Sequence, residues 1–161
     1  MKIKFAKLKE NAIIPTKEKE NLGYDVYACF DTDALKIRKG EVKMIPTGIA
    51  SVIDEDYGVI IKERGSTGSK GLSVRCGVID SNFRGEWFIA INNTTDHDII
   101  ITKPNVPVSM GVNDVLYPYT KAIAQAVIIP NIVTDVEEIT VEELEANKTS
   151  RGKGKLGSSG K

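Results

Sequence analysis

The sequence predicts an all-β fold, because apolar runs of strand length recur along its 161 residues and turn-forming residues separate them. Several runs alternate apolar and polar side chains, as half-buried strands do; Leu35 and Ile37, for example, alternate with Lys36 and Arg38. We expect strands over residues 3–8, 22–30, 34–38, 42–44, 49–53, 57–61, 78–79, 86–91, 99–102 and 122–129. Many short strands at roughly regular spacing indicate a β-sandwich, a jelly roll or a barrel.

Two segments carry helical signals, and we include one short helix in the expected fold. Residues 66–71 follow a strand and can form one turn of helix after Arg64. Thr140 and Glu143 have the spacing of a capping box, which marks the start of a helix. Residues 103–119 contain three prolines and Gly111, so we expect an irregular excursion outside the core.

The composition narrows the possible functions. Lysine plus arginine and aspartate plus glutamate both number 22, so bulk charge gives no reason to expect nucleic-acid binding. No signal peptide is recognisable, and no apolar run approaches the roughly 20 residues of a membrane helix. Cys29 and Cys76 form no CxxC motif or disulfide framework, so we expect a cytoplasmic protein, or one of the host cytoplasm if the chain is viral. With His97 as the only histidine, a zinc site is not expected.

Residues 77–86 contain an acid in a predicted hairpin. Asp80 directly follows two β-forming residues and precedes the turn formers Ser81 and Asn82, and an apolar run resumes at Trp87. A carboxylate on a rigid hairpin, with the ring of Phe83 three residues on, can activate a water beside a flat ligand. The alternative is an ordinary turn that Asp80 merely begins, and this segment alone does not decide between the two.

Four further segments have polar side chains suited to a phosphate or a metal. Arg64 and Ser66 end a strand where a helix can begin, which suits a phosphate. Asp25 follows a glycine in a strand and could hold Mg²⁺ or one of its waters. Gln125 is an amide in an apolar strand and needs a partner. The tail over residues 151–160 is rich in Gly, Ser and Lys. Each segment also has a purely structural interpretation: a polar connection, a turn acid, a backbone partner or a flexible terminus.

Taken in chain order, the five segments resemble the trimeric dUTP pyrophosphatase (dUTPase) family over residues 22–161. The most specific part of the resemblance is the run Gly-Val-Ile-Asp, two residues, an aromatic residue and Arg-Gly over residues 77–85. The family fold is a jelly-roll-like β-barrel, assembled as a homotrimer with three sites at subunit interfaces. The resemblance implies a β domain over residues 1–146 with an insertion near 103–119. It also implies a flexible glycine-rich C-terminal arm, residues 147–161, that closes over an active site.

The resemblance also implies the chemistry of the hairpin. The enzyme would hydrolyse dUTP to dUMP and pyrophosphate by water attack on the α-phosphorus. Asp80 would deprotonate this water and contact the sugar 3′-hydroxyl. Phe83, where the family usually has Tyr, would pack under the deoxyribose. The backbone from Gly77 through Ile79 to Asp80 would bind the uracil edge and leave no room for the methyl group of thymine.

The remaining segments would hold the triphosphate and its cofactor Mg²⁺. Asp25 would hold the metal through water, whereas Arg64 and Ser66 would contact phosphates. Gln125 would reach a phosphate from another subunit. The residues of the arm that would clamp or cover the bound nucleotide are Arg151, Leu156, Ser158 and Ser159.

The chain departs from the family pattern at several positions. Gly65 replaces a serine that donates to a phosphate, and Ala122 replaces an arginine before Ile-Ala-Gln. Lys155 and Leu156 stand where the tail usually has Gly-Phe; the family Phe stacks on uracil, and such stacking is worth roughly 1–3 kcal/mol. We therefore expect an active enzyme with a looser closed state. Residues 103–119 exceed the usual short connection.

Two alternatives stay open at this stage. A dCTP deaminase shares the fold, but it needs a glutamate ten residues after the aspartate, where this chain has Ala90. A non-catalytic nucleotide-binding or partner-binding trimer is the second alternative, with residues 103–119 as the surface that contacts an unknown protein. The sequence favours the dUTPase interpretation because the acid, the arginine and the glycine-rich tail are all present.

Overall fold

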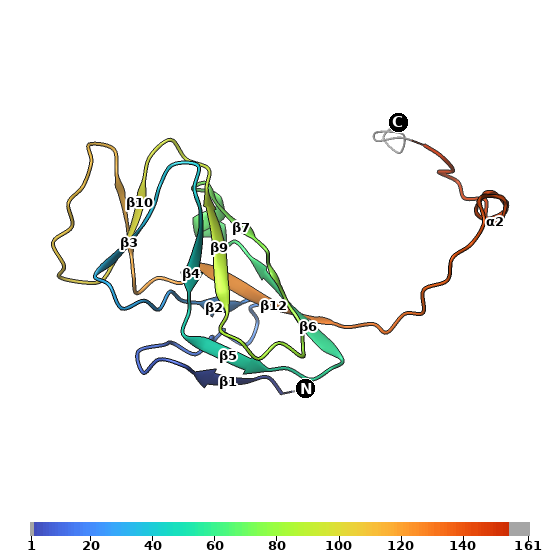
Figure 1. Ribbon diagram of the computed structural model, residues 1–161, viewed down its shortest axis with the longest axis horizontal. Helices are drawn as coiled ribbons and strands as arrows, with labels where there is room; N and C mark the ends of the chain where they lie inside the picture. The colour runs from blue at the N-terminus through green and yellow to red at the C-terminus, as the bar shows by residue number, and fades with distance from the viewer. Residues whose placement is uncertain (1, 155–161) are drawn as a thin grey trace.

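The computed structural model describes residues 2–154, and in that range strands dominate (Figure 1). The strands are β1 (Lys4–Lys7), β2 (Tyr24–Val26), β3 (Ala34–Ile37), β4 (Val42–Pro46), β5 (Ile49–Val52), β6 (Tyr57–Lys62), β7 (Leu72–Arg75), β8 (Val78–Ile79), β9 (Phe88–Asn93), β10 (Ile99–Thr102), β11 (Val115–Pro118) and β12 (Ala124–Pro130). The helices are α1 (Gly65–Gly68) and α2 (Val141–Ala146). The described residues thus contain two short helices, not the single one expected. None of the helices in this range is long and apolar enough to span a membrane.

The strands form four small sheets around one core. Their orders are β1-β5, β11-β10-β3, β2-β12-β6-β8 and β4-β9-β7, and every pairing is antiparallel except β10 with β11. Neighbours in a sheet are mostly distant in sequence, as in Greek-key and jelly-roll folds. The arrangement confirms the all-β, jelly-roll-like fold.

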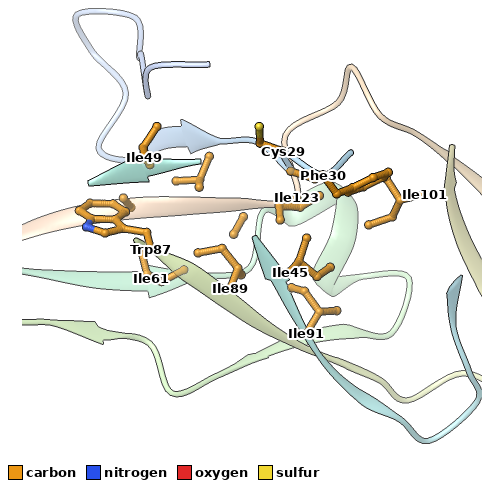
Figure 2. Packing of buried hydrophobic residues seen from close by; sticks show 14 of the residues in the cluster. Cys29, Phe30, Ile45, Ile49, Ile61, Trp87, Ile89, Ile91, Ile101 and Ile123 are labelled. Atoms are coloured by element: carbon orange, nitrogen blue, oxygen red, sulfur yellow. The ribbon is translucent and has the colours of Figure 1, made fainter. Parts of the chain in front are cut away.

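The core consists largely of isoleucine side chains, with Trp87 towards one end of the cluster (Figure 2). Trp87 is fully buried, and its indole N–H donates to Ser51 Oγ at 3.2 Å, so its polar atom is satisfied. Phe5 meets the indole edge-on, with ring centroids 5.4 Å apart. Fully burying one such large apolar side chain stabilises the fold by roughly 1.5–3 kcal/mol. The fully buried isoleucines are Ile37, Ile45, Ile49, Ile89, Ile91 and Ile100.

The predicted hairpin over residues 77–91 is wrong as a pairing. Strand β8 pairs with β6, whereas β9 pairs with β4 and β7, so the two arms belong to different sheets. The turn between them is real, because Phe83 N donates to Asp80 O at 3.1 Å. The arms diverge beyond this turn because Trp87 N donates to Ile49 O, which directs the chain towards β5. Strand β7 was not predicted.

Residues 103–119 are not entirely irregular, because their last part forms the edge strand β11. This strand pairs in parallel with β10, with Ile101 opposite Tyr117. Parallel neighbours need a crossover connection of about a dozen residues or more. Residues 103–114 supply this connection, which gives the excursion a structural reason beyond an inserted surface loop.

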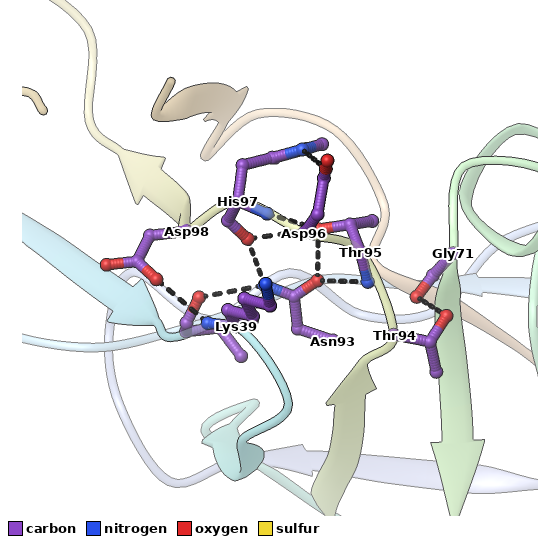
Figure 3. Close-up of polar contacts among 9 residues, drawn as sticks. Lys39, Gly71, Asn93, Thr94, Thr95, Asp96, His97 and Asp98 are labelled. Carbon is purple, nitrogen blue, oxygen red and sulfur yellow. Dashed lines mark hydrogen bonds and ion pairs between the residues drawn. The ribbon is translucent and has the colours of Figure 1, made fainter. Parts of the chain in front are cut away.

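A buried asparagine at the end of β9 joins the end of β3 to the loop over residues 94–98 (Figure 3). The Nδ2 atom of Asn93 donates to Ile37 O at 3.1 Å and to His97 O at 2.8 Å. Its Oδ1 atom accepts from Thr95 N at 3.1 Å and from Thr95 Oγ1 at 2.6 Å. These four bonds use the whole capacity of the amide, as a fully buried polar group requires.

After β12 the chain leaves the body as an extended segment, residues 131–154, that carries α2 (Figure 1). The predicted capping box is present, since Thr140 Oγ1 accepts from Glu143 N and Thr140 N donates to the Glu143 carboxylate. Apolar side chains stand exposed among the acidic residues of this segment: Val133 is 88% exposed and Val136 is 95% exposed. Exposed apolar residues gathered on one segment usually mark a contact surface.

We expect Asn93→Ala to destabilise the fold by about 2–4 kcal/mol, because it leaves two backbone carbonyls and Thr95 without their buried partner. Urea denaturation measures this loss. Asn92→Ala, which removes the neighbouring and half-exposed amide, is the matched control and should cost less than about 1 kcal/mol. Equal losses in the two variants would contradict the role given to Asn93.

Candidate active site

The predicted site residues that precede the C-terminal tail lie near the two ends of strand β6. Beyond its last residue lies the Arg64 cluster, which we define as Asp25, Glu63, Arg64, Ser66 and Gln125. Beside its first residues lies the Asp80 turn, which we define as residues 77–84. Strand β6 is hydrogen-bonded to β12 on one side and to β8 on the other, so both groups are fixed to one rigid element.

The Arg64 cluster is assembled by the register of three neighbouring strands. Gln125 of β12 lies opposite Asp25 of β2 on one side and opposite Lys62 of β6 on the other. Arg64 follows two residues after Lys62, where the strand has ended and α1 begins. Three segments that are distant in sequence thus line one cavity of about 740 Å³.

The guanidinium of Arg64 is held side-on by Asp25. Its Nε atom lies 2.8 Å from Asp25 Oδ1, and its Nη2 atom donates to Asp25 Oδ2 at 3.3 Å. Its Nη1 atom donates to Ala122 O at 3.3 Å and to Ser66 Oγ at 3.4 Å. The arginine fork is therefore fixed in orientation while its side chain stays 29% exposed to a ligand in the cavity.

Gln125 has found a backbone partner within the same cavity. Its Nε2 atom donates to Glu63 O at 2.7 Å. The backbone at Gly23 approaches the amide so closely that a Cβ atom there would lie 2.4 Å from Gln125 Oε1. Both interpretations of Gln125 are thus compatible with its position, since the amide satisfies backbone and also lines the cavity.

Helix α1 places Ser66 beside Arg64. The helix begins at Gly65, one residue before the predicted start at Ser66. Arg64 N donates to Thr67 Oγ1 at 3.1 Å, and Thr67 N donates back to Arg64 O at 3.0 Å, which fixes the entry into the helix. A Cβ atom at Gly65 would meet nothing within 4 Å, so no packing constraint requires glycine where the family commonly has serine.

The Asp80 turn is held by strand β6 and by its own Arg84. Ile79 pairs with Val59 of β6, and Ile61 N donates to Gly77 O at 2.6 Å. At Gly77 a Cβ atom would lie 2.6 Å from Ile61 O, so this close approach requires glycine. On the outer side, Arg84 Nη1 donates to Ser81 O at 2.6 Å and to Phe83 O at 2.9 Å, bracing the turn.

The Asp80 side chain is exposed at the edge of a shallow apolar cavity. This cavity of about 260 Å³ is lined by Val78, Ile79 and Phe83 of the turn, together with Met44, Glu86 and Phe88. Phe83 is 41% exposed, so it is not a core aromatic residue. Asp80 also lines a second cavity, between β6 and the end of β12. The turn therefore combines an accessible acid with a flat apolar wall.

The two groups of residues line different cavities within residues 2–154. Asp80 follows Ile79, which lies opposite Val59, whereas Arg64 lies five residues beyond Val59 in the other direction. At about 3.3 Å per extended residue, roughly 20 Å separates the two backbones. The cavities beside Asp80 and the cavity beside Arg64 have no lining residue in common.

Of the C-terminal candidates, Arg151 alone lies within the described residues. Arg151 is exposed, and its carbonyl accepts from Gly154 N at 3.1 Å. The candidates Leu156, Ser158 and Ser159 lie outside the described residues. Nothing in residues 2–154 therefore brings the arm to either end of β6.

Comparison with known proteins places this geometry in a family. A model of the dUTPase family matches residues 9–105. The deoxyuridine 5′-triphosphate nucleotidohydrolase of Nautilia profundicola is 37% identical over 165 residues, covering 100% of both chains. That of Debaryomyces hansenii is 31% identical over 154 residues, covering 94% of this chain and 83% of the relative. The chain belongs to the dUTPase family.

Solved dUTPase structures share its fold. The dUTPase of Staphylococcus bacteriophage 80alpha with dUPNHPP aligns with a TM-score of 0.77 over 99% of both chains, at 22% identity. A phage phi11 dUTPase, described with a structural Mg(II) ion, aligns with a TM-score of 0.67 over 86% of this chain and 97% of its own, at 21% identity. At these identities the likeness concerns the dUTPase fold alone.

Three supporting residues of the candidate site were missed from sequence. Glu63 presents its carbonyl to Gln125, and its carboxylate accepts from Val74 N at 2.8 Å, which lowers the pKa of Glu63. Arg84 braces the turn, and Glu86 Oε1 accepts from Gly48 N at 2.7 Å. Each acts on a backbone group far away in sequence, or on a turn whose shape must be known first, so only the Arg-Gly of the family pattern hinted at one of them.

The donor set fits a metal held through water. Within residues 2–154 no group of three or more His, Cys, Asp or Glu side chains is arranged to hold a metal ion directly. Asp25 is a single carboxylate, 35% exposed, at the cavity that Arg64 lines. Mg²⁺ in such sites binds substrate phosphates and one or two carboxylates and keeps several waters, so one carboxylate is compatible with it.

We expect Gly23→Ala to displace the Gln125 amide and break its bond to Glu63 O. The free energy of unfolding should fall by about 1 kcal/mol, the net value of one hydrogen bond. Urea denaturation measures the change. Gly65→Ala, on the same cavity wall, has open space for its methyl group and is the matched control. If both variants unfold at the same urea concentration, the close contact at Gly23 has no energetic weight.

Proposed function

We propose that this protein is a dUTP diphosphatase that hydrolyses dUTP to dUMP and pyrophosphate. Membership of the dUTPase family gives the reaction. The observation that supports it most directly is Asp80, an exposed carboxylate on a braced turn beside a flat apolar wall. Such a group can hold and deprotonate a water next to a bound nucleotide.

In this proposal Asp80 is the general base. It orients a water for in-line attack on the α-phosphorus and takes its proton, while the Pα–O bond to the β-phosphate breaks and pyrophosphate leaves. Phosphoryl transfer needs mainly positioning and charge stabilisation from the protein, so one acid can suffice. Asp80 also accepts a hydrogen bond from the sugar 3′-hydroxyl.

The rest of the turn selects the nucleoside. The backbone from Gly77 through Ile79 to Asp80 binds the uracil edge, and the half-exposed ring of Phe83 packs under the deoxyribose and excludes a 2′-hydroxyl. The carbonyl of Gly77 already accepts from Ile61 N, so this part of the backbone is fixed before the base arrives. A prepositioned backbone discriminates well because it cannot adjust to a thymine methyl group.

The Arg64 cluster binds the triphosphate. Arg64 and Ser66 donate to phosphate oxygens, and Gln125 reaches a phosphate from its place on β12. Asp25 would hold Mg²⁺ through water, and the metal would spread the negative charge of the leaving pyrophosphate. Because Asp25 already orients the guanidinium at 2.8 Å, the cluster needs little rearrangement to receive the anion.

We further propose a homotrimer in which one nucleotide lies between two chains. The Asp80 turn and the Arg64 cluster are about 20 Å of strand apart on one chain, so the Asp80 turn of one subunit faces the Arg64 cluster of another. The segment after β12 supports assembly, since its side chains Val133 and Val136 are not covered by any part of residues 2–154. In the assembled enzyme, residues 147–161 close over the nucleotide through Arg151, Leu156, Ser158 and Ser159.

The two alternatives receive less support. A dCTP deaminase needs an acid where Ala90 stands, and Ala90 is buried, 2% exposed, on the strand between β4 and β7. A non-catalytic trimer leaves the accessible acid and the arginine–aspartate pair without a use. Incubating dUTP, dCTP, dTTP and UTP with Mg²⁺ separates the three: only dUTP should release pyrophosphate, and no nucleotide should release ammonia.

We expect Asp80→Asn to lower kcat for dUTP by about 10²-fold or more, because it removes the base and keeps the shape. A pyrophosphate-release assay measures the rate. Binding of α,β-imido-dUTP, which cannot be hydrolysed, should change only a few-fold. Asp56→Asn, in the exposed turn before β6, is the control and should retain the wild-type rate. Full activity in Asp80→Asn would exclude Asp80 as the base.

Mixing two inactive variants tests the shared site. Asp80→Asn and Arg64→Ala each disable one half-site, but in mixed trimers a wild-type turn can meet a wild-type cluster. Random exchange should restore about a quarter of the wild-type rate, because half of the chains carry each intact half. The double variant mixed with Asp80→Asn should restore nothing. If mass spectrometry confirms exchange and no activity returns, both halves belong to one chain.

A further inference from the structure

The hydroxyl group of Tyr117 and the guanidinium of Arg64 meet at one backbone carbonyl. Tyr117 Oη donates to Ala122 O at 2.7 Å, and Arg64 Nη1 donates to the same oxygen at 3.3 Å. A carbonyl oxygen has two lone pairs, so it can accept both bonds at once. Ala122 is 3% exposed and stands just before β12, three residues from Gln125.

The ring of Tyr117 is fixed by its surroundings. It is half-buried and lines an apolar cavity of about 360 Å³ together with Leu72, Ile99 and Ser66. Burial raises the pKa of the Tyr117 hydroxyl, and the positive charge of Arg64 offsets only part of that rise. The group therefore keeps its proton at neutral pH and remains a donor to Ala122 O.

The tyrosine reaches this position because of the crossover over residues 103–114. The crossover returns the chain to the edge of β10 as a parallel strand, with Ile101 opposite Tyr117. Val115 N then donates to Asp98 O, and Tyr119 N donates to Thr102 O. These bonds fix the strand on both sides of the tyrosine, so the hydroxyl cannot slide away from the carbonyl.

We propose that Tyr117 is a positioning residue that orients Arg64 through the carbonyl of Ala122. Residues 103–119 thereby become part of the phosphate half of the site and no longer a passive insertion. Removing the hydroxyl frees the carbonyl to turn, and Nη1 of Arg64 loses its fixed partner. The proposal rests on the proposed phosphate contact of Arg64, but the two hydrogen bonds to Ala122 O are present without nucleotide.

The first experiment compares Tyr117→Phe with the wild type. The variant keeps the ring and loses one hydrogen bond, so KM for dUTP should rise about three- to tenfold. The value of kcat should change less than about twofold, because Arg64 binds the phosphates before and during the reaction. Tyr119→Phe is the matched control: its ring packs edge-on against Phe30, 5.1 Å away, and it makes no bond to the Arg64 cluster. That variant should keep the wild-type KM.

A double variant shows whether the effect passes through Arg64. In the Arg64→Lys background, which keeps the charge but loses the planar fork, adding Tyr117→Phe should change KM less than about twofold. An equal rise in both backgrounds would show that Tyr117 acts elsewhere and would overturn the proposal. A loss confined to kcat, or the same rise in Tyr119→Phe, would overturn it as well.

A measurement without nucleotide separates this proposal from the proposed function. The Nε–H signal of Arg64 in isotope-labelled protein, assigned by its loss in Arg64→Lys, reports how firmly the guanidinium is held. Tyr117→Phe should speed the exchange of this proton with water at least severalfold, and Tyr119→Phe should not. Unchanged exchange overturns the proposal whether or not the protein hydrolyses dUTP. Absence of hydrolysis in the wild type overturns the proposed function. The orienting role of Tyr117 is then still tested by the exchange of the Arg64 Nε–H proton.

Discussion

The pairing of strand β6 on both of its edges is the constraint on which the rest of the site depends. Because β12 and β8 occupy its hydrogen-bonding groups, the strand can neither shift nor bend without losing ladder bonds on both sides. The Asp80 turn and the Arg64 cluster are therefore held at a fixed separation. In the proposed enzyme, a site that needs both would have to be completed across chains.

The Arg64 cluster is ordered by many modest interactions. The Asp25 carboxylate, the Ala122 carbonyl and the Ser66 hydroxyl each hold a different edge of the guanidinium. A partly exposed ion pair alone contributes little to stability, commonly 0–1 kcal/mol. Its value lies in orientation: an arginine that is already aligned loses less conformational entropy when an anion binds. The same reasoning explains why Arg84, which only contacts backbone carbonyls, matters for Asp80.

Local signals in the sequence predicted much of the fold. The features that the sequence did not predict depend on contacts between segments far apart in the chain. The capping box at Thr140 and the turn at Asp80 are encoded within four residues, and both are present. The hairpin prediction was wrong because Ile79 pairs with Val59 of β6. The composition of a strand does not show which other strand it pairs with. The pair Arg64–Asp25 spans 39 residues, so the sequence placed both residues in a phosphate site without revealing that they touch. Tyr117 was missed because its position depends on a parallel register.

The exposed apolar side chains of this chain acquire a reason once the site is divided between chains. Val133 and Val136 are exposed on the segment after β12, and Val78 and Phe83 are exposed in the Asp80 turn. Covering such surfaces gains roughly 25 cal/mol for each Å² of apolar area removed from water. In the proposed trimer, association that covers the segment after β12 would supply the free energy that brings a turn from one chain to a cluster on the next. Stability and catalysis would then have the same source, since the contacts between subunits would also complete the proposed nucleotide site.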